Sequence, residues 1–253
     1  PFSNCNPFDA MSLRLNINAN FRVGAELPSL EAQYRDLWRL ALFLETIGLP
    51  LSDWCPPADT PENARLNAAF DARGPTTAAL ALAGADKENR RSDLRTLGVW
   101  NGKEDAGGIV LTTLYNTSRI PSNLHLTQEN VASLNGCDTI TQLVFAIVEI
   151  WRPMLVKVTP GGYDEHMIFQ DRPPVGWMIY LPFEVTAMQV PEAAKIIPFV
   201  DHKKKLVNGT LIVSTLDVFD VKNTEHIERA NAIETRLVDQ DLLPTLREFL
   251  TKY

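Results

Sequence analysis

The sequence predicts an α+β protein in which antiparallel sheets carry amphipathic helices packed on one face. Several segments alternate apolar and polar residues with the period of two that marks a half-buried strand. Three longer segments repeat apolar residues at helical spacing, and the strands come in runs instead of alternating one by one with helices. With 253 residues, 45% of them hydrophobic and 22% charged, the chain is long enough for one large core or two small ones.

The first ten residues, PFSNCNPFDA at 1–10, lack periodicity and precede Met11. We expect them to be an artificial leader, with Met11 as the natural start. From Ser12 to Phe21, the segment SLRLNINANF places apolar residues on one face and arginine and asparagines on the other. This alternation predicts a strand with one face toward a core.

A helix is predicted directly after this strand. Ser29 stands where its hydroxyl can cap the helix, and Gly48 and Pro50 end it. The apolar residues at helical spacing are Leu30, Tyr34, Leu37, Trp38, Leu40, Ala41, Leu44 and Ile47.

Residues 49–92 form the least regular part of the chain. We expect a helical insertion with two short helices that open at or near Pro61 and Pro75. Strands then follow at 94–102 and 107–116, and a third after Pro121 completes a meander.

The second half of the chain repeats this order of elements. Asp138 is expected to cap an amphipathic helix that Pro153 ends, and Thr224 is expected to open the last long helix. Strands are predicted between these helices in MLVKVTP, HMIFQ, GWMIYLP, IPFVD and GTLIVSTLDV.

Two of the predicted strands are nearly the same sequence. GGIVLTTLYN at 107–116 aligns with GTLIVSTLDV at 209–218, and both precede a long helix. We therefore expect two tandem sheet-plus-helix units, 11–152 with the insertion at 49–92 and 153–253, packed as one globular body. The alternative is that buried strands in general favour valine, isoleucine, leucine and threonine.

Charge and cysteine content restrict the partners and the compartment. The 24 lysines and arginines against 31 acidic residues leave a net charge of −7, which disfavours nucleic acid and favours a basic partner. Three well-separated cysteines predict neither a disulfide framework nor a zinc site. Without a predicted export signal or an apolar run long enough to cross a bilayer, we expect a cytoplasmic protein that binds no membrane.

No catalytic, cofactor or metal motif stands out. The sequence has no GxSxG, SxxK, GxGxxG or P-loop pattern, and Cys137 at a helix start is expected to be structural. The tetrapeptide YDEH at 163–166 holds the densest set of metal-type ligands, but consecutive residues rarely point at one centre. His125, His202 and Glu149 are expected to be ordinary hydrogen-bonding or flanking residues. We therefore predict no catalytic residue, no cofactor and no metal.

Acidic turns remain as candidates for binding a partner. Rigid turn residues accompany carboxylates, and in one case a tyrosine, in NGKEDAGG, GGYDEH and QDRPPVGW. These ingredients suit recognition of a basic protein, although ordinary solvated loops have the same composition. The predicted partner-binding residues are Glu104, Asp105, Tyr163, Asp164, Glu165 and Asp171.

The arrangement of LWRLALFLETIG, GVWNG, HLTQ, EIWRP and GWMIYLP resembles the immunity protein 52 family, the antidotes of bacterial polymorphic and type VI secretion toxins. The similarity covers about residues 12–250. The resemblance implies a non-enzymatic immunity protein that binds a cognate toxin, in many cases one with a basic nuclease domain. The alternative is a hydrolase or transferase whose site is assembled from distant carboxylates and histidines, for example Asp164 and His166.

Overall fold

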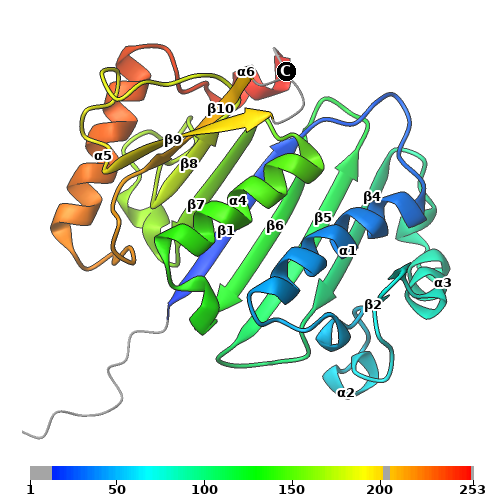
Figure 1. Ribbon diagram of the computed structural model, residues 1–253. Coiled ribbons are helices and arrows are strands. Elements are labelled where there is room, and N and C mark those ends of the chain that lie inside the picture. The colour runs from blue at the N-terminus through cyan, green and yellow to red at the C-terminus, as the bar shows by residue number, and fades with distance from the viewer. Residues whose placement is uncertain (1–12, 202–205, 252–253) are drawn as a thin grey trace, which may run out of the picture.

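The computed structural model describes residues 13–201 and 206–251, so the predicted leader at 1–10 and His202 lie outside the described residues. Within this part of the chain, eight strands form one antiparallel sheet in the order β4-β5-β6-β1-β7-β8-β10-β9 (Figure 1). The α+β class is confirmed. The strands are β1 Arg14–Phe21, β4 Leu94–Trp100, β5 Gly108–Asn116, β6 Ser122–Glu129, β7 Leu155–Pro160, β8 Met178–Leu181, β9 Lys195–Asp201 and β10 Leu206–Val213.

The sheet divides along the sequence into two halves. Strands β4, β5, β6 and β1 form one half and β7, β8, β10 and β9 the other, and pairing of β1 with β7 joins them. The similar segments 107–116 and 209–218 fall on β5 and β10, each one strand in from an edge. However, β10 ends at Val213, so the predicted strand over 209–218 is wrong in its second half. Duplication of a tandem unit stays a prediction.

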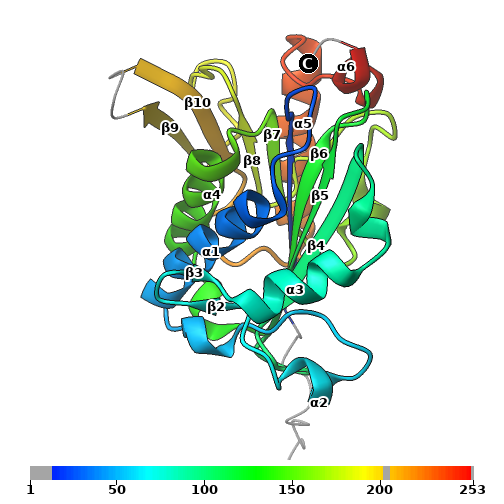
Figure 2. The same ribbon diagram turned by 90° about the vertical axis from the view of Figure 1, so that its right-hand side faces the viewer.

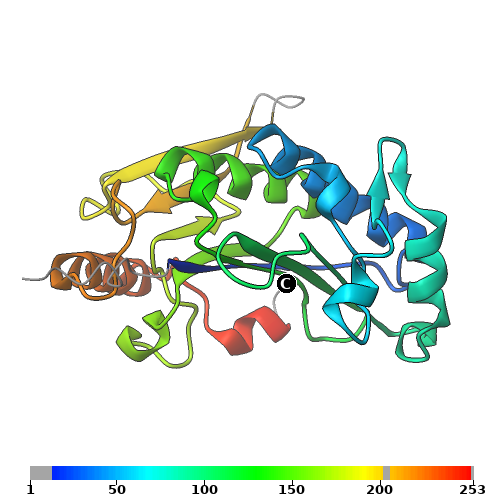
Figure 3. The same cartoon turned by 90° about the horizontal axis from the view of Figure 1, so that it is seen from below.

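Two long helices lie side by side on one face of the sheet (Figures 1 and 3). They are α1 at Leu30–Thr46 and α4 at Cys137–Trp151. Ser29 caps α1 as predicted, since its side chain accepts a hydrogen bond from the backbone N–H of Ala32 at 3.1 Å. The N-cap of α4 is Gly136 and not Asp138, which lies in the first turn without a capping bond.

The helix α5, at Thr224–Asp239, packs on the opposite face of the sheet. In β8, Met178 and Tyr180 join the core beneath α4, whereas Ile179 and Leu181 cluster with residues of α5. The prediction that the helices share one face is therefore wrong for α5. The physical reason is that β8 is apolar on both faces and needs cover on both.

The predicted insertion contains two short helices, as expected. They are α2 at Pro61–Ala64 and α3 at Thr77–Ala85, with a small hairpin of β2 (Phe70–Asp71) and β3 (Gly74–Pro75) between them. The insertion lies beside the β4 edge (Figure 2). An isolated bridge between Cys55 and Trp100 ties it to that edge, with N–H···O distances of 2.8 and 3.1 Å.

The last third of the chain departs from the prediction in one segment. HMIFQ at 166–170 forms no strand, and the preceding residues Tyr163–His166 form a 3-10 turn, η4. Pro244 separates α5 from the short helix α6 at Leu246–Thr251. The remaining 3-10 turns are η1 Leu51–Asp53, η2 Glu88–Arg90 and η3 Ala132–Leu134. The pair β9–β10 curls toward α4 (Figure 2), where Phe145 of α4 meets Phe199 of β9 with ring centroids 5.3 Å apart.

Candidate functional site

Two of the predicted acidic turns lie at the same end of the sheet. The β4–β5 turn carries Glu104 and Asp105, and the turn after β7 carries Asp164 and Glu165; all four residues are exposed. Antiparallel pairing places the start of β5 and the end of β7 at one end, and three strand spacings separate them by roughly 14 Å. Asp171 lies apart, beside α6, because its carbonyl accepts a hydrogen bond from the N–H of Leu246 at 2.7 Å.

Tyr163 is not part of this surface. Its side chain is 0% exposed and packs edge-on against Phe219, with ring centroids 5.6 Å apart. Burial raises the pKa of its hydroxyl above the ordinary value. The preceding Gly162, at a positive φ of 83°, begins the turn that carries the tyrosine inward. The expectation that Tyr163 lies on a recognition surface together with the carboxylates is therefore wrong for the free protein.

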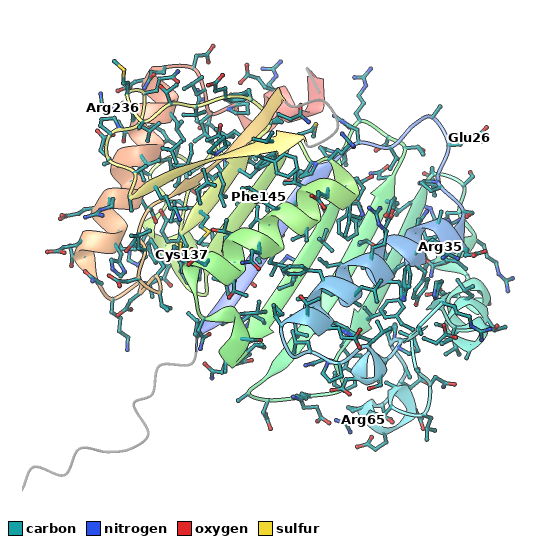
Figure 4. The ribbon with its side chains drawn as sticks, viewed as in Figure 1. Glu26, Arg35, Arg65, Cys137, Phe145 and Arg236 are labelled. Atoms are coloured by element: carbon teal, nitrogen blue, oxygen red, sulfur yellow. The ribbon has the colours of Figure 1, made fainter. Side chains whose placement is uncertain are left out.

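Hydrogen bonds made by two side chains, those of Asn101 and Arg65, hold the β4–β5 turn in place. The buried Asn101 accepts a hydrogen bond from the N–H of Ile109 at 2.9 Å and donates one to the carbonyl of Gly107 at 2.8 Å. Glu104 accepts one from Arg65 at 2.5 Å, and the same guanidinium lies 5.3 Å from the ring centroid of Trp100. Arg65 directly follows α2 (Figure 4), so this contact joins the end of α2 to the turn. Glu104 is therefore already paired, and Asp105 is exposed.

A groove lies beside the insertion. Part of it is on the face of β4 and β5 that turns away from α1 and α4, and part lies around the β4 edge, where Tyr34 of α1 and Leu82 and Ala83 of α3 line it. It consists of two adjoining clefts of about 350 and 330 Å³, which share Pro57, Ala58 and Gly98. We call this feature the insertion groove. The first cleft is lined mainly by apolar groups, those of Pro57, Ala58, Pro61, Ala64, Val99, Trp100 and Val110. The second is more polar and includes Asp59, Asn63, Asp86 and Asn89.

Sequence reasoning missed the insertion groove, although part of its signal was visible. Strand alternation puts Trp100 and Val110 on the same side, opposite the buried Val99 and Ile109, and the two are register partners. What the sequence did not disclose is that residues 57–64 would fold back along this strand pair and add a wall.

A separate cleft, of about 390 Å³, opens on the helix side of the sheet. We call it the helix-side cleft; it lies between the end of α4 and the curled pair β9–β10. Its charged lining residues are Arg39, Glu149 and Arg152. Glu149 is exposed here, as expected for a position flanking the apolar stripe of α4.

The described histidines serve in packing and hydrogen bonding. His125 lies 2.6 Å from Oδ1 of Asn18 and 2.7 Å from Oγ1 of Thr127, and burial with nearby cations lowers its pKa. The Nδ1 of His226 accepts a hydrogen bond from the N–H of Asp220 at 3.0 Å. His166 packs its ring against Tyr163, at 6.3 Å between centroids. These environments suit structural roles better than acid–base catalysis.

Within residues 13–201 and 206–251, no group of three or more histidine, cysteine or acidic side chains could hold a metal ion. Cys137, at the start of α4 (Figure 4), has its pKa raised mainly by burial and also by the charge of Asp138. A raised pKa favours the thiol over the reactive thiolate, in agreement with a structural role.

Comparisons with known proteins identify the family and the fold. A family model described as immunity protein 52 matches residues 29–246, which is most of the chain. The comparison with curated proteins gives no match. Among solved structures, the Pseudomonas aeruginosa T6SS protein PA0821 is similar, with 13% identity and a TM-score of 0.56 over 89% of this chain and 72% of that chain. At this identity the similarity shows a shared fold alone. Within the described residues, no helix combines the length and the apolar character needed to cross a membrane.

Proposed function

The chain belongs to the immunity protein 52 family, and from this membership we propose that it neutralises a cognate bacterial toxin by binding it, without a catalytic step of its own. The observation that carries the proposal is the match of the family model over residues 29–246. The sites described above support it further, because the exposed acidic turns and the clefts offer surfaces for contact with a partner.

The toxin that we propose is an effector of type VI secretion with a basic nuclease domain. The structural neighbour carries the T6SS designation, which supports this secretion route. The net charge of −7 supports a basic partner, since opposite charge raises association rates and lowers the affinity for unsuitable partners. A toxin of this kind acts in the cytoplasm, and we place the immunity protein there.

The exposed carboxylates at one end of the sheet are proposed contacts. Asp105, Asp164 and Glu165 are exposed around this end, and Glu104 beside them holds Arg65. Long-range attraction from such groups acts over about 8–10 Å at physiological salt. They therefore serve to speed encounter with a basic protein, while tight binding needs a more buried contact elsewhere.

Co-expression tests the proposal directly. The protein encoded by the neighbouring gene is expressed in a host cell with and without this chain, and growth and co-purification are measured. We expect growth to stop in the first case and to recover in the second, with the two proteins purifying as a stoichiometric complex. Growth arrest that this chain does not relieve, together with no complex, would contradict the proposal.

A further inference from the structure

We propose that the insertion groove receives an extended segment of the toxin that carries an apolar anchor side chain flanked by basic residues. This inference rests on the proposed function and specifies which surface carries it and what chemistry the partner must bring.

The shape of the groove suits a strand-like or extended peptide. Its two clefts share Pro57, Ala58 and Gly98, so the lining passes from Trp100 on the outer face of β4 around the edge of this strand to Leu97 and to Tyr34 of α1. Each cleft, at about 350 and 330 Å³, is large enough for one or two side chains but too small for a folded element. An extended segment that passes over the β4 edge would reach both clefts with different side chains.

The apolar cleft has the composition of an interface anchor site. Trp100 and Val110 form its floor, and prolines 57 and 61 form much of its wall. Val110 is 44% exposed even though it lies within a strand, which leaves an aliphatic side chain facing the open cleft. Tryptophan in a well-packed pocket is among the residues that contribute most to protein–protein affinity. Arg65, stacked over Trp100 and bonded to Glu104, restrains the ring.

The negative charge of the groove lining suits basic residues on either side of the anchor in the toxin segment. The charged side chains among the lining residues of the insertion groove are two carboxylates, Asp59 and Asp86. Outside the lining, α2 and the β4–β5 turn carry the exposed carboxylates Glu62 and Asp105 and the exposed cations Arg65 and Lys103, of which Arg65 is paired with Glu104. In contrast, the helix-side cleft is lined by two arginines and one glutamate, which suits a basic partner less well. Of the two surfaces, the insertion groove is the one complementary to the proposed toxin.

The groove is formed before any partner binds. The bridge between Cys55 and Trp100 fixes the residues just before the wall to β4. The chain after the wall returns to the same place, because the N–H of Ala69 donates a hydrogen bond to the carbonyl of Trp54 at 2.7 Å. Between them, Thr60 caps α2 by accepting a hydrogen bond from the N–H of Asn63 at 3.2 Å. A preformed site avoids the entropy cost of ordering a loop on binding, which favours high affinity.

Two substitutions in the groove and two matched controls test the inference. Val110→Lys and Asp59→Lys add a positive charge to the apolar and acidic parts of the groove. Val200→Lys and Glu149→Lys make the same changes in the helix-side cleft, at a valine that is 39% exposed and at an exposed carboxylate. All four side chains project into solvent, so the folds are expected to persist, and equal melting temperatures confirm this. Affinity is measured by calorimetry against the product of the neighbouring gene, inactivated by substitution and purified.

Each result has a distinct meaning. We expect both groove variants to bind at least tenfold more weakly than the parent, and both controls to stay within about twofold. If the parent binds and the groove variants bind equally well, the inference is wrong while the proposed function stands. Loss of binding in the controls alone would assign the interface to the helix-side cleft. If the parent itself does not bind, the proposed function fails and this inference falls with it.

Discussion

Glu234 on α5 is fully buried, and its carboxyl group accepts a hydrogen bond from the N–H of Val175 at 3.3 Å. Burial is the largest influence on its pKa and raises it from 4.5 to about 7. Hydrogen bonds from the backbone N–H groups of Val175 and Phe169 favour the ionised form and offset part of this effect. The unfolded chain releases this proton at lower pH than the folded protein does. The contribution of Glu234 to the free energy of unfolding is therefore fully present below pH 4.5, and it is lost as the pH rises toward 7.

Glu234→Gln removes this titration and should flatten the pH dependence. Gln keeps the size and an acceptor oxygen for Val175, so little change is expected at pH 5. Between pH 5 and pH 8, the unfolding free energy of the parent should fall by about 2 to 3 kcal/mol more than that of the variant. Urea denaturation of both proteins at the two pH values measures the difference. A difference that does not change with pH would show that Glu234 titrates as an ordinary carboxyl group.

Tyr163 belongs to the core, and its substitution should affect folding and not recognition. Tyr163→Ala deletes a fully buried ring that packs on Phe219 and should cost about 3 to 5 kcal/mol of unfolding free energy. Tyr163→Phe keeps the ring and loses a contact with Asn231 that is long, at 3.5 Å. We expect the phenylalanine variant to match the parent in melting temperature within a few degrees and in toxin affinity. A selective loss of affinity in Tyr163→Phe would return this residue to the interface.

At the scale of secondary-structure elements, the curled half of the sheet depends on a close approach between β8 and β10. Gly209 in β10 faces Tyr180 of β8, and a Cβ added at the glycine would lie 2.6 Å from Cε2 of the tyrosine ring. The ring is buried and meets Phe199 edge-on at 6.2 Å, so it has little room to move. The Tyr180 hydroxyl also donates to the carbonyl of Asn208 at 3.2 Å.

Gly209→Ala should therefore destabilise the protein by about 1 to 3 kcal/mol through overpacking. Gly98→Ala is the matched control, because it also lies in a strand but its nearest neighbours would be 3.7 and 3.8 Å from an added Cβ. The control should be neutral or slightly stabilising. Thermal unfolding of the two variants tests the comparison, and equal melting temperatures would mean that the Tyr180 ring yields to the methyl group.

Elements with a strong local signal were predictable from the sequence. The α1 helix follows from Ser29 and the apolar stripe, and the meander β4–β5–β6 follows from alternation and turn residues. Errors arose where tertiary contacts decide. HMIFQ is apolar enough for a strand but follows a 3-10 turn that packs on Phe219, and α4 begins at Cys137 without the cap that Asp138 was expected to supply. Local propensity carries no information about such contacts.

At the scale of the whole molecule, the sequence predicted the class but not how the strands assemble. Period-two patterns show which residues face a core, yet they do not reveal that β1 would join β6 to β7 and so unite eight strands in one sheet. The candidate site was likewise only partly predictable from the sequence. The acidic turns could be named from the sequence, and Asp105, Asp164 and Glu165 are exposed at one end. The insertion groove could not, because it arises where residues 57–64 meet strands 94–100 and 108–116.

Amide hydrogen exchange of the chain, alone and mixed with an equimolar amount of inactivated toxin, tests the central claim most directly. The wall of the insertion groove, residues 57–64, consists mostly of exposed loop and a single helical turn, so its amides should exchange fast in the free protein. We predict that toxin slows exchange there and around Asp86, while residues 148–153 and 195–200 along the helix-side cleft are unchanged. Protection confined to the helix-side cleft, or no protection anywhere in the presence of toxin, would contradict the account.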